Sequence, residues 1–101
     1  MSDAQVRLDV PGGRASVHAS GEFDVATAPV LREALQQACG SALDVELDLS
    51  GVTFMDACGL REIARARNTL RNAGCCLNVV HASAPVRRVF ELTGMSVLIP
   101  A

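Results

Sequence analysis

The residues best suited to chemistry lie in the stretch 48–66, "DLSGVTFMDACGLREIARA". A strand-like apolar pattern ends there, a carboxylate follows at Asp56, and a helical pattern begins at once. Turns from a strand into a helix often bind phosphate, because the first amides of a helix can donate to an anion. The next three residues, Ala57, Cys58 and Gly59, carry no hydroxyl group. The stretch is therefore a working site, a disabled site or a helix cap.

Asp56 stands where a helix N-cap is expected, and capping alone would explain it. Its carboxylate can accept hydrogen bonds from the amides of Cys58 or Gly59, and its charge suits the positive end of the helix dipole. In the functional interpretation, the same amides hold an anion or an acidic group of a partner. Because Asp56 would compete for those amides, we favour capping.

Two further residues of this turn have both a functional and a structural interpretation. Cys58 lies in the first helical turn, where the helix dipole favours a thiolate, so the residue is a candidate for oxidation. A small, half-buried packing residue is the favoured alternative. Gly59 costs a helix about 1 kcal/mol relative to alanine. We therefore expect a neighbouring loop or another protein to approach its backbone closely.

Catalytic motifs are missing elsewhere in the sequence. His18 and His81 have no Ser, Cys or carboxylate at the spacing of a catalytic triad. Neither glycine-rich phosphate-binding motif occurs. The four cysteines form neither CxxC pairs nor a zinc pattern with the histidines; they are Cys39, Cys58, Cys75 and Cys76. We therefore predict that the protein is not an enzyme and uses no metal or cofactor.

Length and composition indicate one compact domain over residues 1–101. Half of the 101 residues are apolar, which is enough for a modest core. The formal net charge of −2 argues against a nucleic-acid-binding protein, which normally has a concentrated basic surface. No apolar run approaches the roughly 20 residues that span a bilayer, and the first residues lack a signal-peptide pattern. We expect a cytoplasmic protein with no membrane partner.

Hydrophobic periodicity places the elements around this turn. Alternation predicts strands at 6–10, 14–20, 43–49 and 76–81 and a short one at 96–99, with a hairpin turn at 11–13 and a break at 21–24. Helical spacing predicts helices after the caps Thr27, Asp56 and Ser83, ending near residues 40, 73 and 94. The expected buried faces comprise Val30, Leu31, Ala34, Leu35 and Ala38 in the first helix, and Leu60, Ile63, Ala64 and Leu70 in the second.

The strand at 43–49 alternates most regularly, with leucine or valine on one side and acids on the other. This pattern is typical of a sheet with one covered face and one wet face. We expect Arg7 and Arg14, on neighbouring strands, to balance the acids Asp44, Glu46 and Asp48. The order of elements predicts an α/β fold with a mixed sheet of four to five strands and helices packed mainly on one face. Right-handed crossovers place the helix starts at one end of the sheet.

The stretch "DLSGVTFMDACGL" (48–60) resembles the signature of the STAS domain, the fold of bacterial anti-sigma factor antagonists. The segments "GEFDVATAPVLREAL" (21–35) and "ASAPVRRVFELTGM" (82–95) are similar to the first-helix and third-helix segments of that family. The resemblance implies an antagonist that binds an anti-sigma factor and releases a sigma factor for transcription. The implied partner is also a serine kinase with a histidine-kinase-like ATPase fold, and it phosphorylates a serine directly after the signature aspartate.

Carried over to this sequence, the signature aspartate is Asp56 and the phosphorylation-site equivalent is Ala57, which has no oxygen to phosphorylate. Thr53, the nearest hydroxyl, lies before the turn in a stretch expected to be extended. Ala57 is either a natural variant outside the phosphorylation switch or a replacement of serine. The resemblance implies a partner-binding face made of the 21–28 loop, the 56–60 turn and the outer side of the following helix; its residues are Glu22, Asp24, Thr27, Asp56, Ala57, Cys58, Gly59, Leu60, Arg61 and Arg65.

Two alternatives and one further expectation accompany this interpretation. STAS domains also serve as scaffolds or adaptors in stress-signalling and transport complexes. Cys58 could replace phosphorylation with a redox switch on the same surface. Family members usually continue into a further C-terminal helix, whereas this sequence stops at Pro100 and Ala101, so we expect exposed core surface that favours a homodimer or partner docking.

Overall fold

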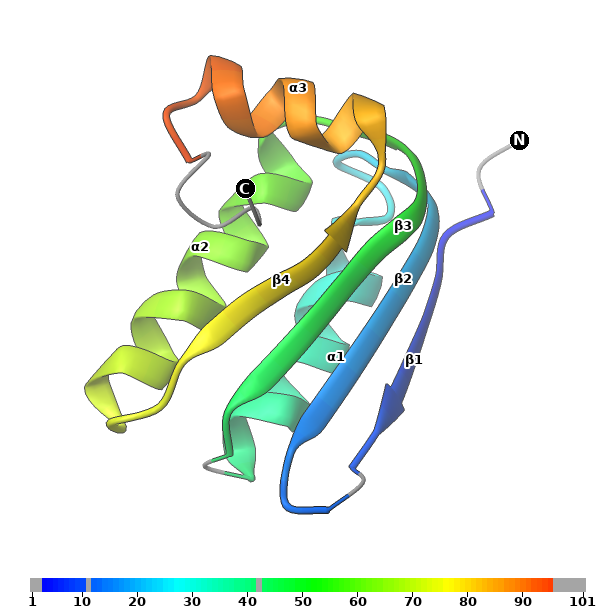
Figure 1. Ribbon diagram of the computed structural model, residues 1–101. Helices are drawn as coiled ribbons and strands as arrows, with labels where there is room; N and C mark the ends of the chain where they lie inside the picture. Colours follow the sequence, from blue (N-terminus) through cyan, green and yellow to red (C-terminus); the bar gives the residue numbers. More distant parts are fainter. Residues whose placement is uncertain (1–2, 11, 42, 96–101) are drawn as a thin grey trace.

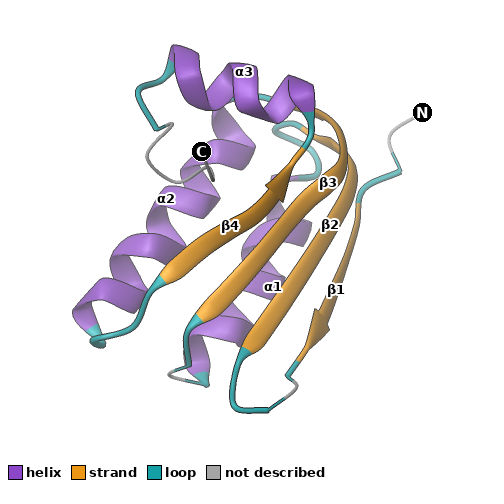
Figure 2. Cartoon of the chain, in the orientation of Figure 1, coloured by secondary structure: helices purple, strands orange, loops and turns teal. Residues whose placement is uncertain are grey.

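The protein folds into two layers, a sheet and the helices that cover one of its faces (Figures 1 and 2). Its structure, a computed structural model, describes residues 3–10, 12–41 and 43–95. Along the chain the elements are β1 (Gln5–Asp9), β2 (Ala15–Phe23), α1 (Ala28–Gly40), β3 (Val45–Met55), α2 (Ala57–Asn72), β4 (Leu77–Ala82) and α3 (Ala84–Leu92). This order confirms the predicted α/β class. The strand predicted at 96–99 lies outside the described residues.

The described sheet has four strands in the order β1-β2-β3-β4. β1 and β2 form an antiparallel hairpin, whereas β2 with β3 and β3 with β4 are parallel. The hairpin turn contains Gly12 and Gly13, whose φ angles of 60° and 81° suit glycine. Because β2 and β3 are parallel neighbours, the loop after β2 and the turn after β3 emerge at the same edge of the sheet (Figure 1).

Two strands are longer than predicted. The break expected at 21–24 is wrong, because β2 continues to Phe23, which is fully buried. Register shifts beside residues 19 and 21, with Gly21 at φ 94°, interrupt the side-chain alternation on which the prediction relied. β3 likewise runs to Met55 rather than stopping at residue 49.

The core lies between the sheet and the helices. On β3, Val45, Leu47 and Leu49 are completely buried, and the alternating acids face the wet side, as predicted. The buried faces of the helices differ from the prediction. The buried residues are Ala28, Leu31, Leu35 and Ala38 in α1, and Gly59, Leu60, Glu62, Ile63, Ala66 and Leu70 in α2. The prediction for Val30 is wrong, because its side chain is 41% exposed. Ala64 is only half-buried, and Ala66 takes the inner position instead.

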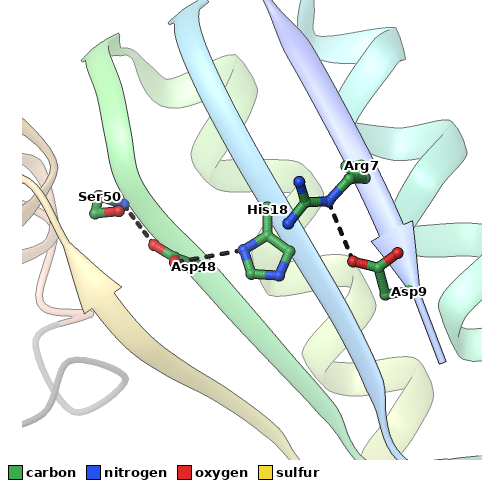
Figure 3. Close-up of polar contacts among 5 residues, drawn as sticks. All are labelled: Arg7, Asp9, His18, Asp48 and Ser50. Carbon is green, nitrogen blue, oxygen red and sulfur yellow. Dashed lines mark hydrogen bonds and ion pairs between the residues drawn. The ribbon is translucent and has the colours of Figure 1, made fainter. Parts of the chain in front are cut away.

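Charged side chains on the wet face pair differently from the prediction. Arg14 contacts Glu46 on the neighbouring strand, with 3.4 Å between Nη1 and Oε2, which confirms one of the two expected pairs. The prediction for Arg7 is wrong, because its Nε lies 3.1 Å from Oδ2 of Asp9 in its own strand (Figure 3). Both arginines are largely exposed, so neither pair contributes much to stability.

A histidine takes the place expected for Arg7. His18 stands opposite Asp48 across the β2–β3 pair, and its Nδ1 lies 3.4 Å from the Asp48 carboxylate (Figure 3). The same carboxylate accepts a hydrogen bond of 2.9 Å from the backbone N–H of Ser50. Asp48 of β3 is therefore held by His18 of the neighbouring β2 and by the backbone of its own strand.

Candidate functional site

The turn between β3 and α2 has the geometry of a capped helix start. Asp56 has an extended backbone, and its Oδ1 accepts a hydrogen bond of 2.8 Å from the N–H of Cys58. This bond confirms the predicted capping role. It also occupies a first-turn amide that an external anion would need, so the helix start alone makes a poor anion site.

The residues after Asp56 differ in exposure. Ala57 is exposed at the surface, and Cys58 is half-buried beside it. Thr53 lies within β3, in the extended conformation expected from the sequence. A partner that reaches this turn therefore meets a methyl group where the family resemblance places a phosphorylated serine.

Gly59 is buried because the end of β2 lies against its backbone. A side-chain carbon added there would lie 3.0 Å from Cγ of Met55, 3.2 Å from Cβ of Phe23 and 3.4 Å from the Phe23 carbonyl oxygen. The expected close approach is thus confirmed, and the approaching segment belongs to this chain. The glycine sets how tightly α2 packs on the strand ends.

The loop before α1 is held by a hydrogen-bond network around Asp24 and Thr27. The Thr27 hydroxyl donates to the carbonyl oxygen of Glu22 at 2.8 Å and accepts from the backbone N–H of Asp24 at 3.0 Å. Asp24 Oδ1 accepts from the N–H groups of Ala26 and Thr27, at 2.9 and 3.1 Å. Thr27 is therefore at the N-cap position, but its side chain does not cap the helix, and that part of the prediction is wrong.

The same network holds Asp24 in its ionised form. The hydrogen bond from the Thr27 hydroxyl and those from the backbone N–H groups of Thr27, Ala26 and Asp24 together outweigh desolvation and lower the pKa of the Asp24 carboxyl. The loop thus presents a fixed negative charge near the start of α1.

The two segments predicted to form one face are directly connected. The backbone N–H of Asp56 donates to the carbonyl oxygen of Phe23 at 3.1 Å. This bond brings the 21–28 loop beside the 56–60 turn.

Arg61 and Arg65 are exposed on α2, and Arg65 leans toward Glu62, with 3.6 Å between Nη1 and Oε1. Glu62, which is 7% exposed, was missed because nothing in its sequence context marks a buried acid.

Two exposed hydrophobic side chains at this edge were also missed. Val25, in the loop after β2, is 76% exposed, and Phe54, near the end of β3, is 47% exposed. Phe54 lines a hollow of about 360 Å³ together with Met55, Ala84, Pro85, Arg88 and Val89. The sequence carried no periodic signal for Phe54, because the alternation of buried and exposed residues in β3 ends after Leu49. We call Val25, Phe54, Asp56, Ala57 and Arg61 the docking edge.

The docking edge combines exposed apolar side chains with charged ones. Large exposed apolar side chains beside fixed charges are typical of protein interfaces. In the part of the chain that the structure describes, no three His, Cys, Asp or Glu side chains are grouped to hold a metal ion. Across the same residues, no helix has the length and apolar character needed to span a bilayer.

Comparisons with known proteins agree with this architecture. Residues 6–100 match the family model described as "Mlab, STAS domain". The chain is 32% identical over 83 residues to the anti-sigma-B factor antagonist of Bacillus subtilis, covering 82% of this chain and 76% of that protein. It is 33% identical over 84 residues to the antagonist of the same name from Listeria monocytogenes, covering 82% and 74% of the two chains.

Solved structures show the same fold. An anti-sigma factor antagonist from Mycobacterium paratuberculosis superposes with a TM-score of 0.86 at 28% identity, covering 97% of this chain and 84% of that one. Unphosphorylated SpoIIAA, also an anti-sigma factor antagonist, superposes with a TM-score of 0.82 at 18% identity, covering 95% and 86%. From the family match, the relatives and the shared fold, the chain belongs to the STAS-domain family.

Proposed function

We propose that this protein is an anti-sigma factor antagonist that acts by protein–protein docking. The observation that carries the proposal is the exposure of Val25 and Phe54 beside the Asp56 turn. Buried apolar anchors near the centre of an interface usually supply most of its binding free energy. The names of relatives at 32–33% identity support the choice of an anti-sigma factor as the partner.

The proposed partner is a serine kinase with a histidine-kinase-like ATPase fold, and its capture releases a sigma factor in the cytoplasm. A phosphate would add about −1.5 to −2 charges next to the Asp56 carboxylate and weaken docking. Ala57 cannot receive that phosphate. The protein therefore behaves as an antagonist that remains in its binding form.

The test measures binding to the anti-sigma factor kinases encoded in the source genome by isothermal titration calorimetry. Val25→Asp and Phe54→Asp should each weaken binding at least about tenfold, because each buries a charge against an apolar contact. Leu92→Asp is the matched control, since Leu92 is 80% exposed on α3 outside the docking edge. Loss of binding by the control alone, or no binding by the unaltered protein, would contradict the proposal. A stable complex that contains no kinase or sigma-factor regulator would instead favour the adaptor role.

A redox switch at Cys58 is the second candidate, because this half-buried thiol adjoins Ala57 at the docking edge. Oxidation of the thiol by peroxide to sulfenic acid would place a polar group beside the apolar anchors. The candidate requires that peroxide treatment weaken partner binding and that Cys58→Ser remove this effect. Equal affinity of the reduced and treated protein would rule it out.

A further inference from the structure

A groove between α1 and α2 runs along the helical layer, away from the sheet. Its hollow has a volume of about 280 Å³ and is lined by Arg32, Leu35, Gln36, Cys39, Gly40, Glu62, Arg65, Ala66 and Thr69. Leu35 and Ala66 are buried and form an apolar floor. One arginine stands on each helix, Arg32 on α1 and Arg65 on α2.

The two arginines of the groove have N–H groups that can still donate hydrogen bonds to a ligand. Glu62 is 7% exposed, and its Oε1 lies 3.6 Å from Nη1 of Arg65. The contact holds the Arg65 guanidinium at the groove and uses little of its five-donor capacity. Arg32 has no ion-pair partner among the described side chains. A ligand with acidic groups on both sides could therefore be bound by both arginines.

The rest of the helical layer has the same sign of charge. Seven of the nine arginines lie on the three helices, which carry three glutamates. Within residues 3–10, 12–41 and 43–95, Arg65 alone among these seven has an ion-pair partner. Such a field attracts an acidic surface and repels a basic one. The positive charge of the three helices and that of the groove therefore both favour an acidic ligand.

We propose that this groove binds an acidic amphipathic helix of a partner protein. One apolar side chain of that helix enters the hollow above Leu35 and Ala66, and flanking carboxylates contact Arg32 and Arg65. A helix fits because two neighbouring helices form a concave apolar seat, which matches side chains at i, i+3 and i+4 of a third helix. A flat anionic bilayer would not fill a hollow of this shape. The proposal does not depend on the docking edge or on its partner.

The thiol of Cys39 gives a local test, because it lines the groove and is half-buried. The probe is a synthetic peptide of about 14 residues, or roughly four helical turns, with leucine at i, i+3, i+4 and i+7 and glutamate elsewhere. The measurement is the rate at which N-ethylmaleimide alkylates Cys39 in the whole protein, located by peptide mass. We expect the peptide to slow alkylation of Cys39 and to leave the exposed Cys76 unchanged.

Charge variants make the test specific. Arg32→Glu and Arg65→Glu should each raise the peptide concentration needed for half-protection about fivefold. Arg71→Glu is the matched control, because Arg71 is exposed on α2 but belongs neither to the groove nor to the docking edge. The proposal is overturned if millimolar peptide fails to protect Cys39, or if a peptide with lysine in place of glutamate protects equally. It is also overturned if vesicles of phosphatidylglycerol, but not the acidic peptide, protect Cys39.

Discussion

The backbone N–H of Asp56 donates to the carbonyl oxygen of Phe23 at 3.1 Å, and this bond joins the ends of two parallel strands. The residue that caps α2 is thereby fixed to the strand that leads into α1. A displacement of either loop must break or stretch this bond. The start of α2 and the end of β2 are therefore held together by a direct bond.

Gly59→Ala should loosen this junction. The added carbon would be pressed against Met55 and Phe23, and the Phe23 backbone cannot move without disturbing the bond to Asp56. Overpacking outweighs the gain of about 1 kcal/mol in helix propensity, so we expect a net loss of about 1 kcal/mol in the free energy of unfolding. Urea denaturation measures it.

Gly40→Ala is the control for that substitution. A side-chain carbon at Gly40, the last residue of α1, meets nothing within 4 Å. It should leave stability unchanged or raise it by up to about 1 kcal/mol. Equal effects of the two substitutions would show that the crowding at Gly59 is unimportant.

Asp56→Ala should destabilise the protein through loss of the N-cap. The free energy of unfolding should fall by about 1 kcal/mol, because the N–H of Cys58 loses its acceptor. Asp56→Asn keeps an oxygen at the same place and should retain most of the stability. If thermal melting shows the two variants to be equally destabilised, the charge of Asp56 matters more than its hydrogen bond.

The regular parts of the fold could be predicted from the sequence because each rests on one strong periodic signal. The helix at 57–72 and the strand core at 45–49 have such patterns, and the cap at Asp56 follows from its position. The end of β2 could not be predicted in this way, because two register shifts interrupt its alternation. Val30 was misplaced because the inner face of α1 is narrower than its apolar composition suggests.

The adjacency of the two loops was predicted, but the exposed apolar side chains beside them were not. The family resemblance named the two loops, and the chain brings them together through the Phe23–Asp56 bond. Val25 and Phe54 were missed because residue type alone does not distinguish an exposed apolar side chain from a buried one. The role of Thr27 was misassigned because a hydroxyl at an N-cap can bond backward to the Glu22 carbonyl as well as forward into the helix.

Asp48 should contribute to stability in a pH-dependent way. Partial burial opposes its ionisation, but hydrogen bonds from Ser50 and His18 and the field of His81 outweigh it, so the pKa of Asp48 lies below its ordinary 3.8. A lowered folded-state pKa gives stability that is present above the unfolded pKa and is lost as pH falls through the folded pKa. Asp48→Asn should therefore be less stable than the parent at neutral pH, and the difference should shrink below pH 3.8.

Urea denaturation across this pH range measures the difference, which should not exceed about 1 kcal/mol because the pair with His18 is partly exposed. Asp9→Asn is the control, since Asp9 pairs with Arg7 at the surface of β1. A difference between Asp48→Asn and the parent that stays constant with pH would assign the effect to packing rather than to charge.

Ala57→Ser should convert the docking edge into a phosphorylation switch. Residue 57 is exposed in the first turn of α2, so a kinase bound at this edge can reach a hydroxyl there. Intact mass after incubation with the anti-sigma factor kinase and ATP should show one added phosphate on Ala57→Ser and none on the parent. The phosphorylated variant should bind the kinase at least about tenfold more weakly, because the new charge stands beside the Asp56 carboxylate.

Thr53→Ala in the same background is the control and should keep the modification, since Thr53 lies within β3. Phosphate on the parent protein would show that another hydroxyl carries the switch, and the idea of a permanently binding antagonist would then fail.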